Sequence, residues 1–169
     1  MKILETNRLI LRKLSIEDAD FMFELVNEPS WLHSIGDKGV KTLDDARDYI
    51  LKGPIHSYKQ FGFGLYLTEL KQSRIPIGIC GLIKRESLKD VDIGFAFLPS
   101  FWGNGYAYES ASAVIGLAKN ALVLNRIVGV TTLDNHSSIK VLEKLGLRFE
   151  QVIRLSENSS EVNLFARDL

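Results

Sequence analysis

The spacing of apolar residues changes near Phe61, and this change limits the folds that the chain can adopt. Before it, apolar residues recur at helical intervals, as in the set Ala19, Met22, Phe23 and Val26. After it, three segments alternate with a period of two and are joined by polar turns, at 62–70, 76–84 and 91–98. Helical segments combined with a run of antiparallel strands predict a mixed α/β fold built on one sheet.

The other expected elements follow from capping and stop signals. A first strand is expected at 8–14, and capping patterns at Ser15 and Thr42 predict that helices begin there. The second helix should end near Gly53-Pro54, and residues 28–41 between the helices should form a loop. The remaining expected elements are helices at 106–122 and 135–145, and strands at 126–132, 147–153 and 162–167. We therefore expect residues 1–169 to form a single domain, with about seven strands in a mostly antiparallel mixed sheet and about four helices.

Charge and cysteine content argue against several classes of function. Lys plus Arg and Asp plus Glu both number 21, so no overall basic field favours nucleic acid or a membrane as partner. Cys80 is the single cysteine and lies in an apolar run, so we expect a buried, unreactive thiol and no metal site. The sequence shows neither a signal peptide nor an apolar run of membrane-spanning length, which predicts a cytoplasmic location.

A glycine loop connects the strand that ends at Leu98 with the helix that begins at Tyr106. Gly103 and Gly105 let the backbone turn and come close to a large anion. The helix that follows adds unpaired N–H groups and the positive end of its dipole. This arrangement is typical of a pyrophosphate site, and the loop's lack of basic residues leaves binding mainly to the backbone. The alternative is that the glycines only shape a strand-to-helix turn.

Two common nucleotide sites do not match this loop. No Gly-Lys-Ser/Thr tripeptide is present, which argues against a P-loop. Tyr108 stands where a dinucleotide fingerprint needs Gly or Ala, which argues against NAD.

Five segments, in the same order along the chain, resemble the GNAT superfamily of N-acetyltransferases. Its coenzyme A loop is similar to Trp102-Gly103-Asn104-Gly105-Tyr106-Ala107, and its later segments are similar to Asn135-His136-Ser137-Ser138 and Leu142-Glu143-Lys144-Leu145-Gly146-Leu147. The opening segment, 5–12, and Asp92-Ile93-Gly94-Phe95 resemble the RimJ/RimL-like branch, which acetylates ribosomal-protein N-termini.

The resemblance implies a GNAT fold that binds acetyl-CoA between two central strands that splay apart. Phe97 and Leu98 would offer backbone groups to the pantetheine amides, and Asn135 would hydrogen-bond the pantetheine arm. The pyrophosphate would lie on Trp102, Gly103, Asn104, Gly105, Tyr106 and Ala107. Asn135 could equally be a plain helix N-cap.

The same resemblance implies catalytic residues, with two departures from the family pattern. Asp92 stands where the branch commonly carries Glu, and it would act as the base, through water; the alternative is a solvated turn acid. Leu142 stands where many members carry a tyrosine that protonates the thiolate, which leaves Ser138 to bind the cofactor sulfur. His136 neighbours Asn135 and is expected to be an exposed loop residue.

The acceptor site is expected on the first two helices and their loops, with Trp31 and His33 as substrate-binding candidates. Trp31 has two alternatives, because a large aromatic in a polar loop either fills the core or lines a site. The predicted function is acetyl transfer to a primary amine, either a protein N-terminus or a small amine, by a monomer or homodimer. The alternatives are a non-catalytic acyl-CoA sensor and a nucleotide-binding protein unrelated to CoA.

Overall fold

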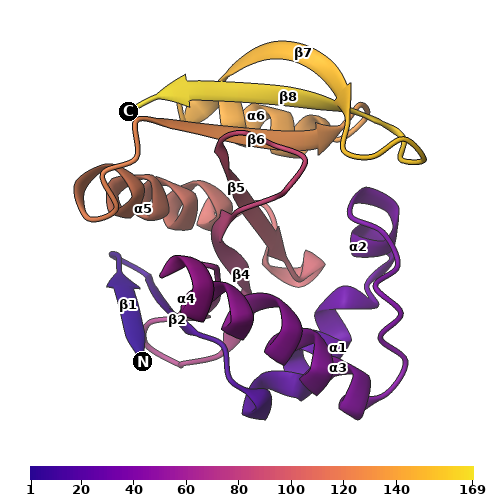
Figure 1. Cartoon of the computed structure of the whole chain (residues 1–169). Coiled ribbons are helices and arrows are strands. Elements are labelled where there is room, and N and C mark those ends of the chain that lie inside the picture. Colours follow the sequence, from indigo (N-terminus) through magenta and orange to yellow (C-terminus); the bar gives the residue numbers. More distant parts are fainter.

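The computed structural model describes residues 1–169 as one eight-stranded sheet with helices on both faces (Figure 1). The strands are β1 (Lys2–Glu5), β2 (Leu9–Lys13), β3 (Leu65–Leu70), β4 (Pro76–Ile83), β5 (Val91–Phe97), β6 (Arg126–Thr132), β7 (Arg148–Arg154) and β8 (Glu161–Asp168). They lie in the order β1-β2-β3-β4-β5-β6-β8-β7. Every neighbouring pair is antiparallel except β5 and β6, which run parallel.

The helical segments fall mainly in two groups along the chain. The first comprises η1 (Ile16–Asp18), α1 (Ala19–Val26), α2 (Pro29–Ser34), α3 (Leu43–Ile50), η2 (Leu51–Ile55) and α4 (His56–Phe61). The second comprises η3 (Pro99–Phe101), α5 (Tyr106–Asn120) and α6 (His136–Lys144). Ser15 and Thr42 both form capping boxes at the expected helix starts.

Two hydrophobic clusters fix the helices on opposite faces of the sheet. One cluster joins α5 and α6 to residues such as Ile93 and Phe97 of β5. The other joins α1 and α3 to Leu98 and, at its margin, Ala96. Because side chains alternate along a strand, odd-numbered residues of β5 face α5 and even-numbered residues face α1 and α3.

The strands β5 and β6 pair at only two positions, Val91 with Ile127 and Asp92 with Val128. On its other side β5 pairs with β4 at six positions, and β6 pairs with β8 at seven. The two central strands therefore part beyond Asp92, and in Figure 1 β5 turns away from the layer of β6, β7 and β8. The splayed mixed sheet predicted from the sequence is confirmed, with one strand more than expected because β1 adds an edge.

Two expectations about the first half of the chain are wrong. The helix that begins after Thr42 does not stop at Gly53-Pro54 but continues through a wide π-helical turn, η2, into α4. A wider turn accommodates the missing N–H and the bulky ring of Pro54, which a regular α-helix could not. The helix ends instead at Gly62, whose φ of 79° suits a left-handed C-cap. The segment 28–41, expected as a loop, contains α2.

Cys80 is fully buried, as expected, and this burial raises the pKa of its thiol to about 12. None of the helices combines the length and the apolar character needed to cross a membrane.

Candidate active site

The glycine loop forms a row of unused backbone donors at the end of β5. The Trp102 N–H bonds to the Pro99 carbonyl, and the next N–H to find a backbone acceptor is that of Glu109, on Gly105. The six N–H groups of residues 103–108 make no hydrogen bond with the protein. Three of them belong to the first turn of α5, where no intrahelical acceptor exists. A row of free amides at a helix N-terminus is suited to a pyrophosphate.

Two left-handed glycines hold this row in place. Gly103 has φ 78° and Gly105 has φ 82°, a conformation that other residues seldom adopt. The Asn104 side chain closes the turn by donating to the carbonyls of Phe101 and Trp102, at 3.1 and 3.2 Å. A Cβ atom on Gly103 would meet no atom within 4 Å, so the space beside the loop is open to a ligand.

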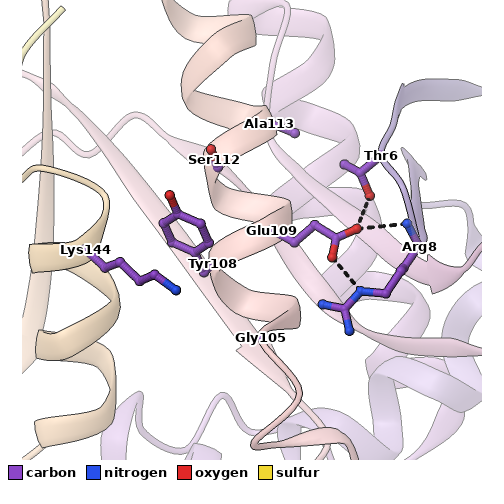
Figure 2. A pocket seen from close by; sticks show the side chains of 8 residues that line it. All are labelled: Thr6, Arg8, Gly105, Tyr108, Glu109, Ser112, Ala113 and Lys144. Carbon is purple, nitrogen blue, oxygen red and sulfur yellow. Dashed lines mark hydrogen bonds and ion pairs between the residues drawn. The ribbon is translucent and has the colours of Figure 1, made fainter.

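The opening segment of the chain lies against the loop and fixes its position (Figure 2). Arg8 donates to the Asn104 carbonyl at 2.9 Å and to Glu109 on α5 at 2.7 Å, and its guanidinium lies over the Tyr106 ring. Glu109 also accepts from the Thr6 hydroxyl at 2.7 Å. The sequence motif around Arg8, which carried part of the family resemblance, thus anchors the first turn of α5.

A second cation faces the same open pocket from α6. The pocket has a volume of about 520 Å³ and includes Arg8, Gly105, Tyr108 and Lys144 in its lining. Lys144 Nζ lies 4.2 Å from the centre of the Tyr108 ring and forms no ion pair, whereas the charge of Arg8 is balanced by Glu109. Neither basic residue lies in the glycine loop itself, so sequence spacing alone assigned them no role.

Beyond Asp92, where β5 and β6 separate, only some backbone groups at the end of β5 are free of hydrogen bonds. The Trp102 indole donates to the Phe97 carbonyl at 2.8 Å, and the Leu98 N–H bonds to the Ile77 carbonyl of β4 at 2.9 Å. Backbone N–H groups point to alternate sides along a strand. Because the N–H of Leu98 points toward β4, those of Phe95 and Phe97 point to the opposite edge of β5, from which β6 has separated. The N–H groups that face this edge are therefore those of Phe95 and Phe97, whereas the N–H of Leu98 is already engaged by β4, so the predicted part of Leu98 in cofactor binding would not use this group.

Asn135 stands where β6 ends and α6 begins. Its side chain caps α6 by accepting the Ser138 N–H at 3.2 Å, so the N-cap role is present. The capping uses Oδ1 alone, and the Nδ2 donors make no hydrogen bond with the protein. Ser138 is half-buried in the first turn of the same helix, and its hydroxyl also makes no hydrogen bond.

Asp92 lies at the point where β5 and β6 part. Its side chain is 2% exposed, and its Oδ2 accepts from Arg85 Nε at 2.8 Å. Burial raises the pKa of Asp92 to about 6, and the charge and hydrogen bond of Arg85 only partly offset this rise. Asp92 is thus a buried, largely ionised carboxylate at neutral pH, and not a solvated turn acid.

A few buried polar side-chain atoms lack a hydrogen-bond partner in the structure. The structure contains four buried side-chain polar atoms that lack a hydrogen bond of normal geometry, and three of them belong to Trp31, Asp92 and Thr132. Thr132 is the last residue of β6, and Asp92 marks the splay point. Such atoms are costly unless a ligand or water satisfies them.

The acceptor candidates Trp31 and His33 both lie on α2 but in different surroundings. Trp31 is 4% exposed in the cluster that contains α1 and α3, with its Nε1 unpartnered. His33 is exposed and contacts Asp134 through Nε2 at 3.0 Å, which joins α2 to the segment just before Asn135. His136 is exposed, as expected, and no group of three or more His, Cys, Asp or Glu side chains is arranged to hold a metal ion.

Comparison with known proteins identifies the family. Residues 8–148 match the family described as acetyltransferase (GNAT) domain. The chain is 30% identical over 154 residues to the uncharacterized N-acetyltransferase YoaA of Bacillus subtilis, covering 90% of this chain and 86% of YoaA. A GNAT-family acetyltransferase structure from Bacillus anthracis matches with a TM-score of 0.81 and 25% identity, covering 99% of this chain and 98% of that one. RimL, a ribosomal L7/L12 alpha-N-protein acetyltransferase solved in complex with coenzyme A, matches with a TM-score of 0.85 and 21% identity, covering 100% and 98%. The chain belongs to the GNAT family and is an acetyl-CoA-dependent acetyltransferase, as its sequence motifs predicted.

Proposed function

We propose that this protein transfers the acetyl group of acetyl-CoA to a primary amine, and that the acceptor is either the α-amine of a peptide N-terminus or a small-molecule amine. The observation that carries the proposal is the row of six free amides at residues 103–108, next to the unpaired edge of β5. Together they offer a site for a pyrophosphate followed by an extended amide-bearing chain, which is the chemistry of coenzyme A.

The residues around the loop suit each part of this ligand. The amides of Gly103 to Tyr108 would hold the pyrophosphate, and Lys144, which has no acidic partner, would add positive charge beside it. The N–H groups of Phe95 and Phe97 would pair with pantetheine carbonyls as a neighbouring strand does. Asn135 would donate to the same arm through Nδ2 while it caps α6 through Oδ1.

Acetyl transfer joins the amine nitrogen to the thioester carbon, breaks the carbon–sulfur bond and releases one proton from the amine. Asp92 is proposed to accept that proton through water, because its carboxylate is buried, ionised near neutral pH and free at Oδ1. Arg85 holds Oδ2 and thereby aims Oδ1. Ser138 is proposed to hydrogen-bond the departing thiolate, since Leu142 is buried in the core and supplies no acid.

The acceptor is proposed to approach from the face of the sheet that carries α1, α2 and α3. The even-numbered residues of β5, Asp92 among them, face this side, whereas α5 covers the other. Trp31 and His33 on α2 are proposed to contact it. RimL is described as an alpha-N-protein acetyltransferase, and the likeness of fold supports a peptide N-terminus as one acceptor class.

A direct assay tests the proposal. Protein, acetyl-CoA and a panel of peptides and small amines are mixed, thiol release is followed, and products are identified by mass spectrometry. We expect turnover with at least one amine of the panel, and a lower Michaelis constant for acetyl-CoA in the parent than in a Lys144→Gln variant. Binding of acetyl-CoA without turnover on any amine would contradict acetyl transfer and favour an acyl-CoA sensor.

A further inference from the structure

Arg85 lies two residues after the end of β4. Its Nε donates to Asp92 Oδ2 at 2.8 Å, and its side chain is 33% exposed while that of Asp92 is 2% exposed. No other hydrogen bond engages the side chain, so both terminal nitrogens are free. Arginine presents its donors as a planar fork that matches carboxylates and phosphates. Arg85 is thus oriented by one buried carboxylate and keeps donors for a second anion.

Arg85 faces the side on which the amine acceptor is proposed to lie. Ala96 of β5 and Leu98, which follows this strand, belong to the cluster with α1 and α3. Asp92 lies on β5 four residues before Ala96 and six residues before Leu98. Side chains separated by an even number of residues share a face of a strand, so Asp92 and the guanidinium bound to it lie on this face. The opposite face is covered by α5.

A second cation, Lys38, lies within electrostatic range of Arg85. Lys38, in the segment between α2 and α3, has its pKa lowered by partial burial and by the charge of Arg85, which places the two cations near each other. Asp37 is engaged by Lys41 at 3.2 Å, and Asp90 is engaged by Arg126 at 3.4 Å. Asp92 is thus the one carboxylate that forms an ion pair with Arg85, and Lys38 forms no ion pair.

We propose that the free terminal nitrogens of Arg85 bind an anionic group of the acceptor, so that the preferred acceptor carries a carboxylate within one side-chain length of its reactive amine. The second observation is Asp92 Oδ1, which is buried beside this fork and lacks a hydrogen bond of normal geometry, although the Val130 N–H lies near enough to this carboxylate to lower its pKa. An acceptor whose amine reaches Oδ1 through the proposed water and whose anion reaches Arg85 satisfies both groups at once. This inference rests on the proposed acetyl transfer and names its substrate class.

Two matched pairs of acceptors test this specificity. The peptides Ser-Glu-Ala-Ala and Ser-Gln-Ala-Ala, both amidated at the C-terminus, differ only in the charge at position two. The pair 4-aminobutanoate and butylamine applies the same comparison to small molecules. The quantity measured is the ratio of kcat/KM for the anionic acceptor to that for its neutral match, in the parent and in the variants Arg85→Gln and Lys38→Gln.

We expect the parent to favour the anionic member of at least one pair by about tenfold or more, as charge-assisted hydrogen bonds do elsewhere. Arg85→Gln should reduce this ratio to near one, and Lys38→Gln, in an exposed segment, should reduce it several-fold. Lys41→Gln serves as the control, because Lys41 is already paired with Asp37, and the ratio should stay at the parent value. Added salt should lower the parent ratio.

The ratio separates failure of this inference from failure of the proposed function. If amines are acetylated but neither pair shows a preference in the parent, the anion site is refuted and acetyl transfer stands. A preference that survives in both Arg85→Gln and Lys38→Gln also refutes it. If no amine is acetylated, both proposals fall.

Discussion

The pKa of Asp92 makes the pH profile of acetyl transfer the sharpest test of the proposed chemistry. A carboxylate with a pKa of about 6 is about 90% ionised one pH unit higher and about 10% ionised one unit lower. The acceptor amine is itself mostly protonated in this range, so its neutral fraction grows about tenfold for each pH unit. After division by that fraction, kcat/KM should therefore fall about tenfold from about pH 7 to about pH 5.

The variants Asp92→Asn and Asp90→Asn distinguish the effect of removing the proposed base from the effect of removing a nearby carboxylate. Asp92→Asn should lower kcat/KM about 100-fold near neutral pH, because general bases typically contribute at least that factor, and it should remove the break near pH 6. Asp90→Asn alters a carboxylate two residues away that is tied to Arg126, and it should keep both the rate and the break. The assay follows thiol release with a disulfide reagent that reacts rapidly at acid pH.

Two results would refute this reasoning. A normalised profile that stays flat down to about pH 5 would mean that no group with the raised pKa of Asp92 takes the proton. An Asp92→Asn variant within threefold of the parent would mean that the buried carboxylate is only structural.

The stability of the folded protein provides a second test of the pKa of Asp92, and this test does not depend on enzymatic turnover. Because burial raises the pKa of Asp92 from 3.8 to about 6, the folded protein holds the proton more tightly than the unfolded chain does. The contribution of Asp92 to the free energy of unfolding is therefore largest below about pH 4 and declines as the pH rises through 6. Asp92→Asn should remove this decline in urea-unfolding experiments at a series of pH values.

Three further substitutions test the cofactor site and the core. Gly103→Ala should lower the free energy of unfolding by about 1 kcal/mol, because Gly103 has a positive φ, and should raise the KM for acetyl-CoA. Gly36→Ala is the control: Gly36 also has a positive φ and open space around it, so this variant should lose stability but keep the parent KM. Lys144→Gln should raise the KM for acetyl-CoA several-fold at low salt, while Lys140→Gln, an exposed lysine of the same helix, should not. Leu142→Ala removes a side chain that is 1% exposed and should lower the free energy of unfolding by about 2–5 kcal/mol; a loss under about 1 kcal/mol in urea titrations would contradict its core placement.

The parts of the fold that follow from local patterns were predictable from the sequence. Strand alternation located β3, β4 and β5, and the motif from Trp102 to Ala107 located the amide row, because two glycines before a helix leave few other conformations. The role of Asn135 as the N-cap of α6 could also be predicted from the sequence. These features depend on residues close together in the chain.

The errors arose where tertiary packing overrode local signals. Gly53-Pro54 normally ends a helix, but here a π-helical turn absorbs Pro54 and buries it. The segment that carries Trp31 is predicted as a loop but forms α2, from which Trp31 fills the second hydrophobic cluster, one of its two predicted alternatives. Both depend on surfaces contributed by distant segments, which no local pattern records.

The site residues divide in the same way. The glycines are a local signal, whereas Arg8 and Lys144 reach the loop from opposite ends of the chain, and their roles needed the fold. Asp92 could be named as a candidate from the resemblance, but its burial and its contact with Arg85 could not.

The two-position junction between β5 and β6 has a mechanical consequence for the whole molecule. It makes the line between the block β1–β5 and the block β6–β8 the most sparsely bonded seam in the sheet. A ligand lying along that seam would act as a replacement strand, so its binding energy would also serve as cohesion between the blocks. Amide hydrogen exchange in β5 and β6 should then slow on both sides when acetyl-CoA binds, and the enzyme without substrate should open first along this line.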